Sequence, residues 1–162
     1  MHYVAYISKD GRHRLAEFPD CPGCQTFSDG EDLAAVAREA LEGWLEAHLV
    51  DGKVPPRPVE RTSAPRGMSV ANVTIRPGLA AALQIRWARR DAGLSQTELG
   101  RLAGVSQQQI TKLEKPDENP SLETLSKVAR ALGLEVSVGL ERPDTMPSVS
   151  APKRRHRRLA DA

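Results

Sequence analysis

The sequence predicts an α+β protein, in which a small antiparallel sheet with one helix precedes an all-α domain and a final strand. Two observations support this fold class. Residues 2–8 are rich in aromatic and β-branched types, as strands are, whereas residues 32–50 repeat apolar side chains at steps of three and four, as helices do. Aromatic residues make up only 4% of the chain, so Leu, Val, Ile and Ala must form most of the core.

Three short strands are expected near the start of the chain. The first two cover residues 2–8 and 12–18, and Lys9-Asp10-Gly11 joins them, because Asp-Gly supplies the positive φ angles that a tight hairpin turn requires. Residues 24–28 are a candidate third strand, which comes after an irregular connection. The hairpin makes the first pair of strands antiparallel.

One amphipathic helix is expected from residue 32 to residue 50. Its apolar residues form one face, and Ser28 or Asp29 is expected to cap its first turn, because a short polar side chain can accept from the unpaired N–H groups there. Gly52 can end the helix in a left-handed conformation. Four prolines come next within residues 53–68 and predict a loop or linker. Residues 70–75 alternate loosely and could return to the first sheet as a further strand.

Four short helices are expected between residues 79 and 132, and a last strand at 134–140. The segment LEVSVGL at 134–140 alternates apolar and polar residues and comes directly after the last helix. A lone strand is not stable, and pairing with the same strand of a second subunit would satisfy its backbone. The sequence therefore predicts a homodimer, or a higher homo-oligomer, with a two-stranded sheet between subunits.

Two of these helices carry the most informative motif, SQTELGRLAGVSQQQITKLE at residues 95–114. Gly100 is small where the two helices must approach, Gly104 can take a left-handed turn, and Ser-x-x-Glu and Ser-x-x-Gln form two capping boxes. The motif resembles the helix-turn-helix of the Cro/repressor family, and the resemblance extends through PSLETLSKVARALGL at 120–134. The alternative is an ordinary helical hairpin without a DNA role.

The resemblance implies that the second helix of the motif lies in the major groove of DNA. Gln107 and Gln108 begin that helix, and a Gln amide matches the adenine edge, while Lys112 could reach guanine or a phosphate. The first helix of the motif begins at Gln96, which is expected to contact a phosphate. The residues expected to contact DNA are therefore Gln96, Ser106, Gln107, Gln108, Thr111 and Lys112. Arg89 and Glu114 align with a pair that forms an internal ion pair in some relatives.

A second resemblance covers residues 3–49. The segments YVAYI and FPDCPGCQTFSDGEDLAAVAREALEGWLE resemble the antitoxins of HicAB toxin–antitoxin systems, with a departure at Cys21, where an apolar residue is expected. This resemblance implies a small partial ribonuclease-H-like fold and binding to HicA, a small basic toxin that cleaves mRNA. The expected organisation is a HicB-like toxin-binding domain at 1–60, a linker at 61–76, a repressor-type DNA-binding domain at 77–142 and a disordered basic tail at 143–162.

The charge distribution suits two partners of opposite sign. Residues 1–60 hold six Lys and Arg against 11 Asp and Glu, a net charge of −5, whereas residues 61–162 hold 17 against 10, a net charge of +7. The acidic part would attract a basic protein or only keep the chain dissolved, and the basic part invites a polyanion. The basic run at 153–158 could add phosphate contacts or serve only as a solubilising tail.

Taken together, these features predict an antitoxin that neutralises a HicA-type toxin and represses its own operon by binding double-stranded operator DNA. No enzymatic activity, cofactor, metal or membrane span is expected, and the cysteine content is typical of the cytoplasm.

Two cysteines, Cys21 and Cys24, have the spacing of a redox motif but are interpreted as a tight turn with one buried thiol. A nuclease is disfavoured, since the first strand carries no mid-strand acid for metal. The alternative function is a stand-alone transcriptional regulator whose first domain senses a small molecule.

Overall fold

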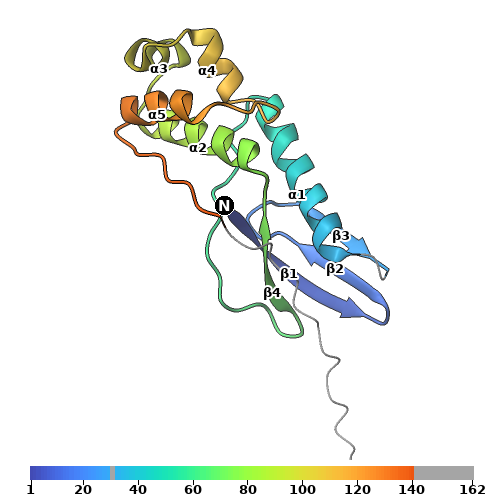
Figure 1. Ribbon diagram of the computed structural model, residues 1–162. Coiled ribbons are helices and arrows are strands. Elements are labelled where there is room, and N and C mark those ends of the chain that lie inside the picture. The colour runs from blue at the N-terminus through green and yellow to red at the C-terminus, as the bar shows by residue number, and fades with distance from the viewer. Residues whose placement is uncertain (30–31, 141–162) are drawn as a thin grey trace, which may run out of the picture.

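A computed structural model describes residues 1–29 and 32–140 of the chain (Figure 1). It contains a four-stranded antiparallel sheet covered by one helix, and then four shorter helices that extend beyond one end of the sheet. The predicted α+β class is therefore confirmed. The expected basic tail at 143–162 lies outside the described residues.

The sheet has the strand order β3-β2-β1-β4. Its strands are β1 (His2–Asp10), β2 (His13–Glu17), β3 (Gln25–Ser28) and β4 (Ser69–Thr74). The turn between β1 and β2 contains Gly11 at a φ of 58°, which is the left-handed conformation that the Asp-Gly pair is expected to supply. The last strand lies in the segment that could return to the sheet, and it pairs with the edge of β1 that β2 leaves open, Tyr3 opposite Val73.

Helix α1 (Leu33–Val50) covers one face of this sheet (Figure 1). Its buried stripe packs with side chains of β1 and β4 in one hydrophobic core and comprises Leu33, Ala37, Leu41, Leu45 and Leu49. The expected N-cap was wrong, because Asp32 caps the helix by accepting a hydrogen bond from the backbone N–H of Ala34 at 3.0 Å. Ser28 belongs to β3 and Asp29 pairs with His13, so neither lies at the first turn.

Four helices form the second part of the molecule: α2 (Pro77–Asp91), α3 (Gln96–Ala103), α4 (Gln107–Leu113) and α5 (Leu122–Ala131). Their core comprises Ile85, Leu99, Ile110, Leu113 and Val128. Glycine is required at two positions where α3 meets the start of α4, one inside α3 and one in the turn after it. Gly104 has a φ of 67°, and a Cβ on Gly100 would lie 2.8 Å from the carbonyl oxygen of Val105.

Helix α2 contributes to both cores. Leu79, Leu83 and Trp87 pack in the core of the sheet, whereas Ile85 packs with the other helices. Because α2 buries side chains on several of its faces, the periodicity of its apolar residues does not reveal which core each of them serves. The sheet unit (β1–β4 and α1) and the helical unit (α2–α5) are therefore joined by a shared helix.

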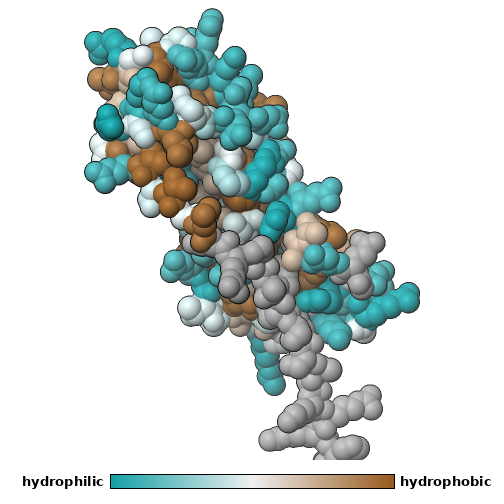
Figure 2. Space-filling model, in the orientation of Figure 1, coloured by the Kyte–Doolittle hydropathy of each residue, from teal (hydrophilic) through white to brown (hydrophobic). Residues whose placement is uncertain are grey.

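Residues 134–140 form no strand in the single chain. Their apolar side chains are exposed, from 38% for Val136 to 99% for Leu140, and Leu122 of α5 is 59% exposed. Figure 2 shows hydrophobic residues gathered on this face of the helical unit. The strand between two subunits stays a prediction. No helix in the described part of the chain is both long and apolar enough to cross a bilayer.

Candidate nucleic-acid interface

The start of each motif helix is fixed by a reciprocal cap. The backbone N–H of Glu98 donates to Ser95 Oγ at 3.1 Å, and the Glu98 carboxylate accepts from the N–H of Ser95 at 2.7 Å. The same exchange links Ser106 with Gln109, at 3.1 and 2.9 Å. The hydrogen bonds from Ser95 lower the pKa of Glu98, which favours the charged cap. Both capping boxes predicted from the sequence are confirmed, and they set the direction of α3 and α4.

The outward row of α4 is formed by residues expected to read DNA. Gln107, Gln108 and Lys112 are exposed, and Thr111 is half-buried. Gln108 and Lys112 are one turn apart and so lie on the same face, and the Gln107 amide donates to Thr111 Oγ1 at 3.5 Å. The two amides can donate to and accept from base edges in a major groove, whereas the ammonium group can only donate to them. Their contact with DNA stays a prediction.

Gln96 has a different environment from the one expected. Its amide nitrogen donates to Glu114 Oε2 at 3.1 Å, and its amide oxygen accepts from Thr111 Oγ1 at 2.9 Å. Both polar ends of the side chain therefore bond inside the protein. The part of Gln96 that can meet a phosphate is its backbone N–H in the first turn of α3, where N–H groups lack intrahelical partners.

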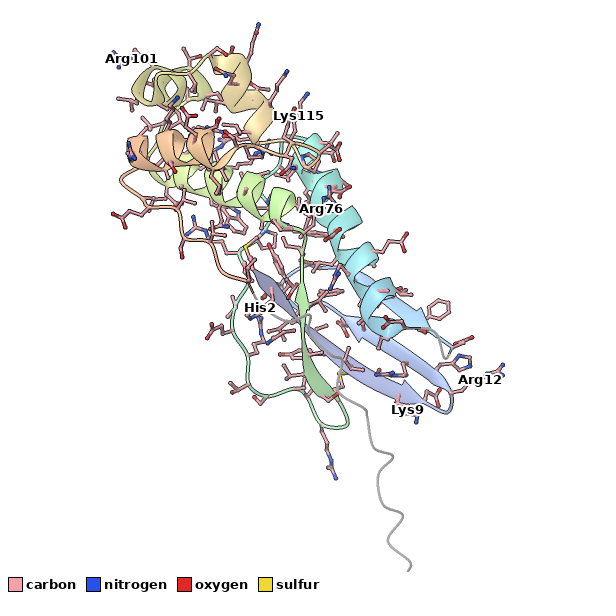
Figure 3. The ribbon with its side chains drawn as sticks, viewed as in Figure 1. His2, Lys9, Arg12, Arg76, Arg101 and Lys115 are labelled. Carbon is pink, nitrogen blue, oxygen red and sulfur yellow. The ribbon has the colours of Figure 1, made fainter. Side chains whose placement is uncertain are left out.

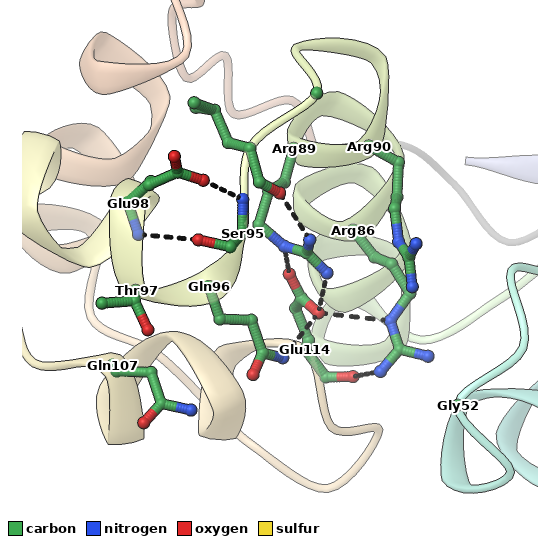
Figure 4. A pocket seen from close by; sticks show the side chains of 12 residues that line it. Gly52, Arg86, Arg89, Arg90, Ser95, Gln96, Thr97, Glu98, Gln107 and Glu114 are labelled. Atoms are coloured by element: carbon green, nitrogen blue, oxygen red, sulfur yellow. Dashed lines mark hydrogen bonds and ion pairs between the residues drawn. The ribbon is translucent and has the colours of Figure 1, made fainter.

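Helix α2, the start of α3 and the end of α4 are joined by a largely buried cluster of charged and polar side chains, which comprises Glu114, Arg86, Arg89 and Gln96 (Figure 4). The Glu114 side chain is fully buried, and it accepts from Arg89 Nε at 2.5 Å and Arg89 Nη2 at 2.9 Å. Arg86 Nε lies 3.3 Å from Glu114 Oε2. The expected pairing of Arg89 with Glu114 is confirmed, and Arg86 is an additional member that the sequence reasoning missed.

The surroundings of Glu114 favour the charged form of its carboxylate. Burial raises the pKa of Glu114, but hydrogen bonds from Arg89 and Gln96 and the charges of Arg89 and Arg86 lower it further, so it ends below its ordinary value. The hydrogen bond to Glu114 raises the pKa of Arg89, whereas burial lowers that of Arg86. Because the cluster holds two guanidinium groups and one carboxylate, its net charge is +1.

Arg86 also reaches the sheet unit. Its Nη1 donates to the carbonyl oxygens of Leu49 at 3.1 Å and Lys53 at 2.9 Å, and its Nη2 donates to the carbonyl oxygen of Glu114 at 3.4 Å. The last carbonyls of a helix lack intrahelical partners, and Arg86 satisfies one of them. One side chain thus ties the end of α1 to the end of α4. The only signal in the sequence is its spacing of three residues from Arg89, which places both on one helix face.

Arg76 makes a second connection at the start of α2 (Figure 3). Its guanidinium pairs with Glu46 and with Glu42, the latter at 3.1 Å, and donates to the carbonyl oxygen of Pro116 at 3.1 Å. Burial lowers the pKa of Arg76, but the bonds to the two carboxylates outweigh that and raise it. The middle of α1 is therefore held against the turn that comes after α4.

A cleft of about 700 Å³ opens beside this site (Figure 4). Its walls are the last turns of α2, the first turn of α3 and the start of α4, and the sheet unit contributes one residue, Gly52. The lining residues are Gly52, Arg86, Arg89, Arg90, Gly93, Leu94, Ser95, Gln96, Thr97, Glu98, Gln107 and Glu114. Most of these lining residues are of polar or charged types.

The cysteine pair forms a turn inside the sheet unit. The N–H of Cys24 donates to the carbonyl oxygen of Cys21 at 2.8 Å, and both thiols are free and buried, where one buried thiol was expected. Burial raises the pKa of Cys21 to about 12 and that of Cys24 to about 11, so both are protonated near neutral pH. Within residues 1–29 and 32–140, no three His, Cys, Asp or Glu side chains are grouped as a metal site requires.

Comparison with known proteins supports both parts of this description. Residues 85–138 match the helix-turn-helix family. The chain is 28% identical over 128 residues to Antitoxin HicB 1 of Photorhabdus laumondii, which covers 78% of each protein. It is 44% identical over 50 residues to an uncharacterised HTH-type transcriptional regulator of Haemophilus influenzae, of which it spans about half, 51%. A solved chain from a HicA3 and HicB3 toxin-antitoxin complex superposes with a TM-score of 0.43 at 28% identity, over 48% of this chain and 100% of that chain.

The match to the HicB antitoxin spans 128 residues, which is more than the chain contains from residue 85 to its end, so the match extends into the sheet unit. Both resemblances found in the sequence are therefore supported by independent matches. The chain is a homologue of HicB antitoxins that carries a helix-turn-helix domain.

Proposed function

We propose that this chain is an antitoxin that binds a small basic HicA-type toxin through its sheet unit and represses its own operon through α3 and α4. The observation that carries the proposal is the 128-residue match to a HicB antitoxin, which extends from the sheet unit into the helix-turn-helix. A partner that acts on mRNA and an operator both imply that the protein acts in the cytoplasm. The proposal assigns the chain no catalytic step.

The geometry of α4 supports the DNA-binding part. Gln107, Gln108 and Lys112 are exposed on a helix whose start is capped and whose end is held by Glu114. Side chains presented from a rigid frame lose little freedom on binding, which favours base recognition. One such module buries little surface, so we propose a dimer on a palindromic operator with half-sites about 34–36 Å apart.

Charge supports the toxin-binding part. The first 60 residues carry a net charge of −5, and a basic toxin would be drawn to that surface. The alternative, a regulator that senses a small molecule, calls for an apolar pocket in the sheet unit. A pocket lined by Met1, His2, Pro58, Val59 and Glu60 has a volume of about 200 Å³, below the roughly 300–1,000 Å³ of most ligand pockets. The cleft of about 700 Å³ lies among charged and polar residues of the helical unit, so neither favours the alternative.

The test is a rescue assay with the full chain. A fragment that ends before residue 69 would lack β4 and the α2 side chains that complete the sheet core, so it is a poor substitute. The small reading frame beside the gene is expressed alone and then together with this protein, and we expect growth arrest in the first case and relief in the second. A second arm uses Gln107→Ala with Gln108→Ala, which should still relieve arrest but no longer repress a reporter driven by the operon promoter. Arrest without relief would favour the stand-alone regulator.

A further inference from the structure

The cleft beside α4 is built by both units of the molecule. Gly52 belongs to the connection after α1, whereas the other lining residues come from the helix-turn-helix and the helix before it. Arg86 fixes this arrangement, because it donates to the carbonyl oxygens of Leu49 and Lys53 on either side of Gly52. The loop after α1 is therefore held at the edge of the DNA-binding surface.

One exposed cationic side chain lines the cleft, and a second belongs to the residue directly after a lining residue. Arg90 lines the cleft from the last turn of α2 and is exposed, and its side chain makes no hydrogen bond or ion pair with another described residue (Figure 4). Lys53 comes directly after Gly52, and its side chain is 62% exposed; within the described part of the chain it pairs with Asp51 alone, at 3.1 Å. Glu98 lines the same cleft, but its carboxylate is engaged with Ser95.

The position of the cleft indicates its occupant. In a helix-turn-helix the second helix enters the major groove and the first crosses the DNA backbone, where helix N-termini contact phosphates. Here the cleft is lined by the first turn of α3, Ser95 to Glu98, and by Gln107 at the start of α4. A phosphate backbone that passes the N-terminus of α3 therefore continues along the cleft, toward Arg90.

We infer that this cleft receives the phosphate backbone of double-stranded DNA, with Arg90 and Lys53 as its charged contacts. The sheet unit would then take part directly in DNA binding through the loop after α1, outside the helix-turn-helix motif. The inference rests on the DNA-binding part of the proposed function. The inferred contacts should raise the affinity for DNA of any base sequence, because phosphate groups are the same at every base pair.

The test measures how the affinity of the full chain for a random-sequence 30-base-pair duplex depends on salt. Each phosphate contact contributes a slope of about 0.9 in log affinity against log salt, so each accounts for about a 3–4-fold loss between 50 and 200 mM salt. We expect Arg90→Ala and Lys53→Ala each to lower the slope by about 0.9 per bound subunit. Asp51→Asn should tighten binding at low salt, since it removes the acid beside Lys53.

Arg12→Ala is the matched control. It removes the same charge from the exposed β1–β2 turn, at the end of the molecule far from α3 and α4 (Figure 3), and should leave the slope unchanged. All the substituted side chains are exposed, so melting temperatures close to that of the wild type are expected and confirm folding. Slopes for Arg90→Ala and Lys53→Ala that equal the slope for Arg12→Ala would overturn the inference and leave DNA binding intact. Absence of duplex binding by the wild type at low salt would refute the proposed function and the inference together.

Discussion

Glu114→Gln is the substitution with the clearest expected effect. The Glu114 side chain is fully buried, and its two arginine partners expose only 10% and 7% of their side chains. The variant keeps an acceptor oxygen for Arg89 but turns an NH₂ group toward a guanidinium and leaves two buried positive charges without an anion. Losing one partner of a buried ion pair costs about 3–5 kcal/mol. For a chain of this size that corresponds to a drop in melting temperature of roughly 6–20 °C.

The assay is urea denaturation and thermal melting of the wild type and the variant at pH 7, with Glu123→Gln as the control. Glu123 pairs with Lys127 on the surface, with 78% of its side chain exposed, and an exposed pair of this kind is worth about 0.3–0.5 kcal/mol. A Glu114→Gln variant that loses no more free energy of unfolding than Glu123→Gln would refute the reasoning, because the cluster would then contribute nothing as an ion pair.

The dependence on pH adds a second check on the same variant. The folded pKa of Glu114 lies below its ordinary value, so its charge stabilises the fold above the unfolded pKa of about 4.3. That contribution is lost as the pH falls through the folded pKa. The difference in unfolding free energy between wild type and Glu114→Gln should therefore be full at pH 7 and shrink below pH ~4. A difference that stays constant down to acid pH would contradict the assignment.

The interface and the cores give three more predictions. Replacing Gln107 or Gln108 by Ala should cost about 1–3 kcal/mol at one base pair of the operator each, and equal losses on every sequence in a binding series would argue for phosphate contacts instead. Deletion of 134–142 should give a monomer with weak operator affinity by ultracentrifugation and binding assays, and an intact dimer would contradict the intersubunit sheet. Cys21 and Cys24 should react slowly with iodoacetamide at pH 8 and quickly in urea, whereas rapid native labelling would contradict their burial.

The features that could be predicted from the sequence are those whose physical cause is local. The capping boxes join residues three apart, and Gly104 satisfies a backbone requirement within one turn, so residue type and spacing were sufficient. The bond from Arg86 to Leu49 joins residues 37 apart and has no local signature. The same reason explains Gln96, whose internal partners lie 15 and 18 residues away, so a family position alone suggested a phosphate contact where the amide bonds within the protein.

The proline-rich connection has a role that its composition does not indicate. Composition predicts a loop, yet the hydroxyl of Tyr3 donates to the carbonyl oxygen of Pro56 at 2.8 Å, and Trp87 Nε1 donates to that of Pro55 at 2.8 Å. Arg61 pairs with Asp20 at 2.6 Å. Prolines lose little conformational entropy on folding, so fixing this connection opposes folding less than fixing an ordinary loop.

This packing makes the two units parts of one body. The connection contacts β1 through Tyr3 and α2 through Trp87, and Trp87 itself belongs to the core of the sheet unit. A cut between α1 and α2 would expose the apolar side of α2 and remove the carbonyl partners of Arg86. A toxin bound to the sheet unit would therefore lie at a defined position relative to α4, and it could affect DNA binding by its bulk or charge without any conformational change in the antitoxin.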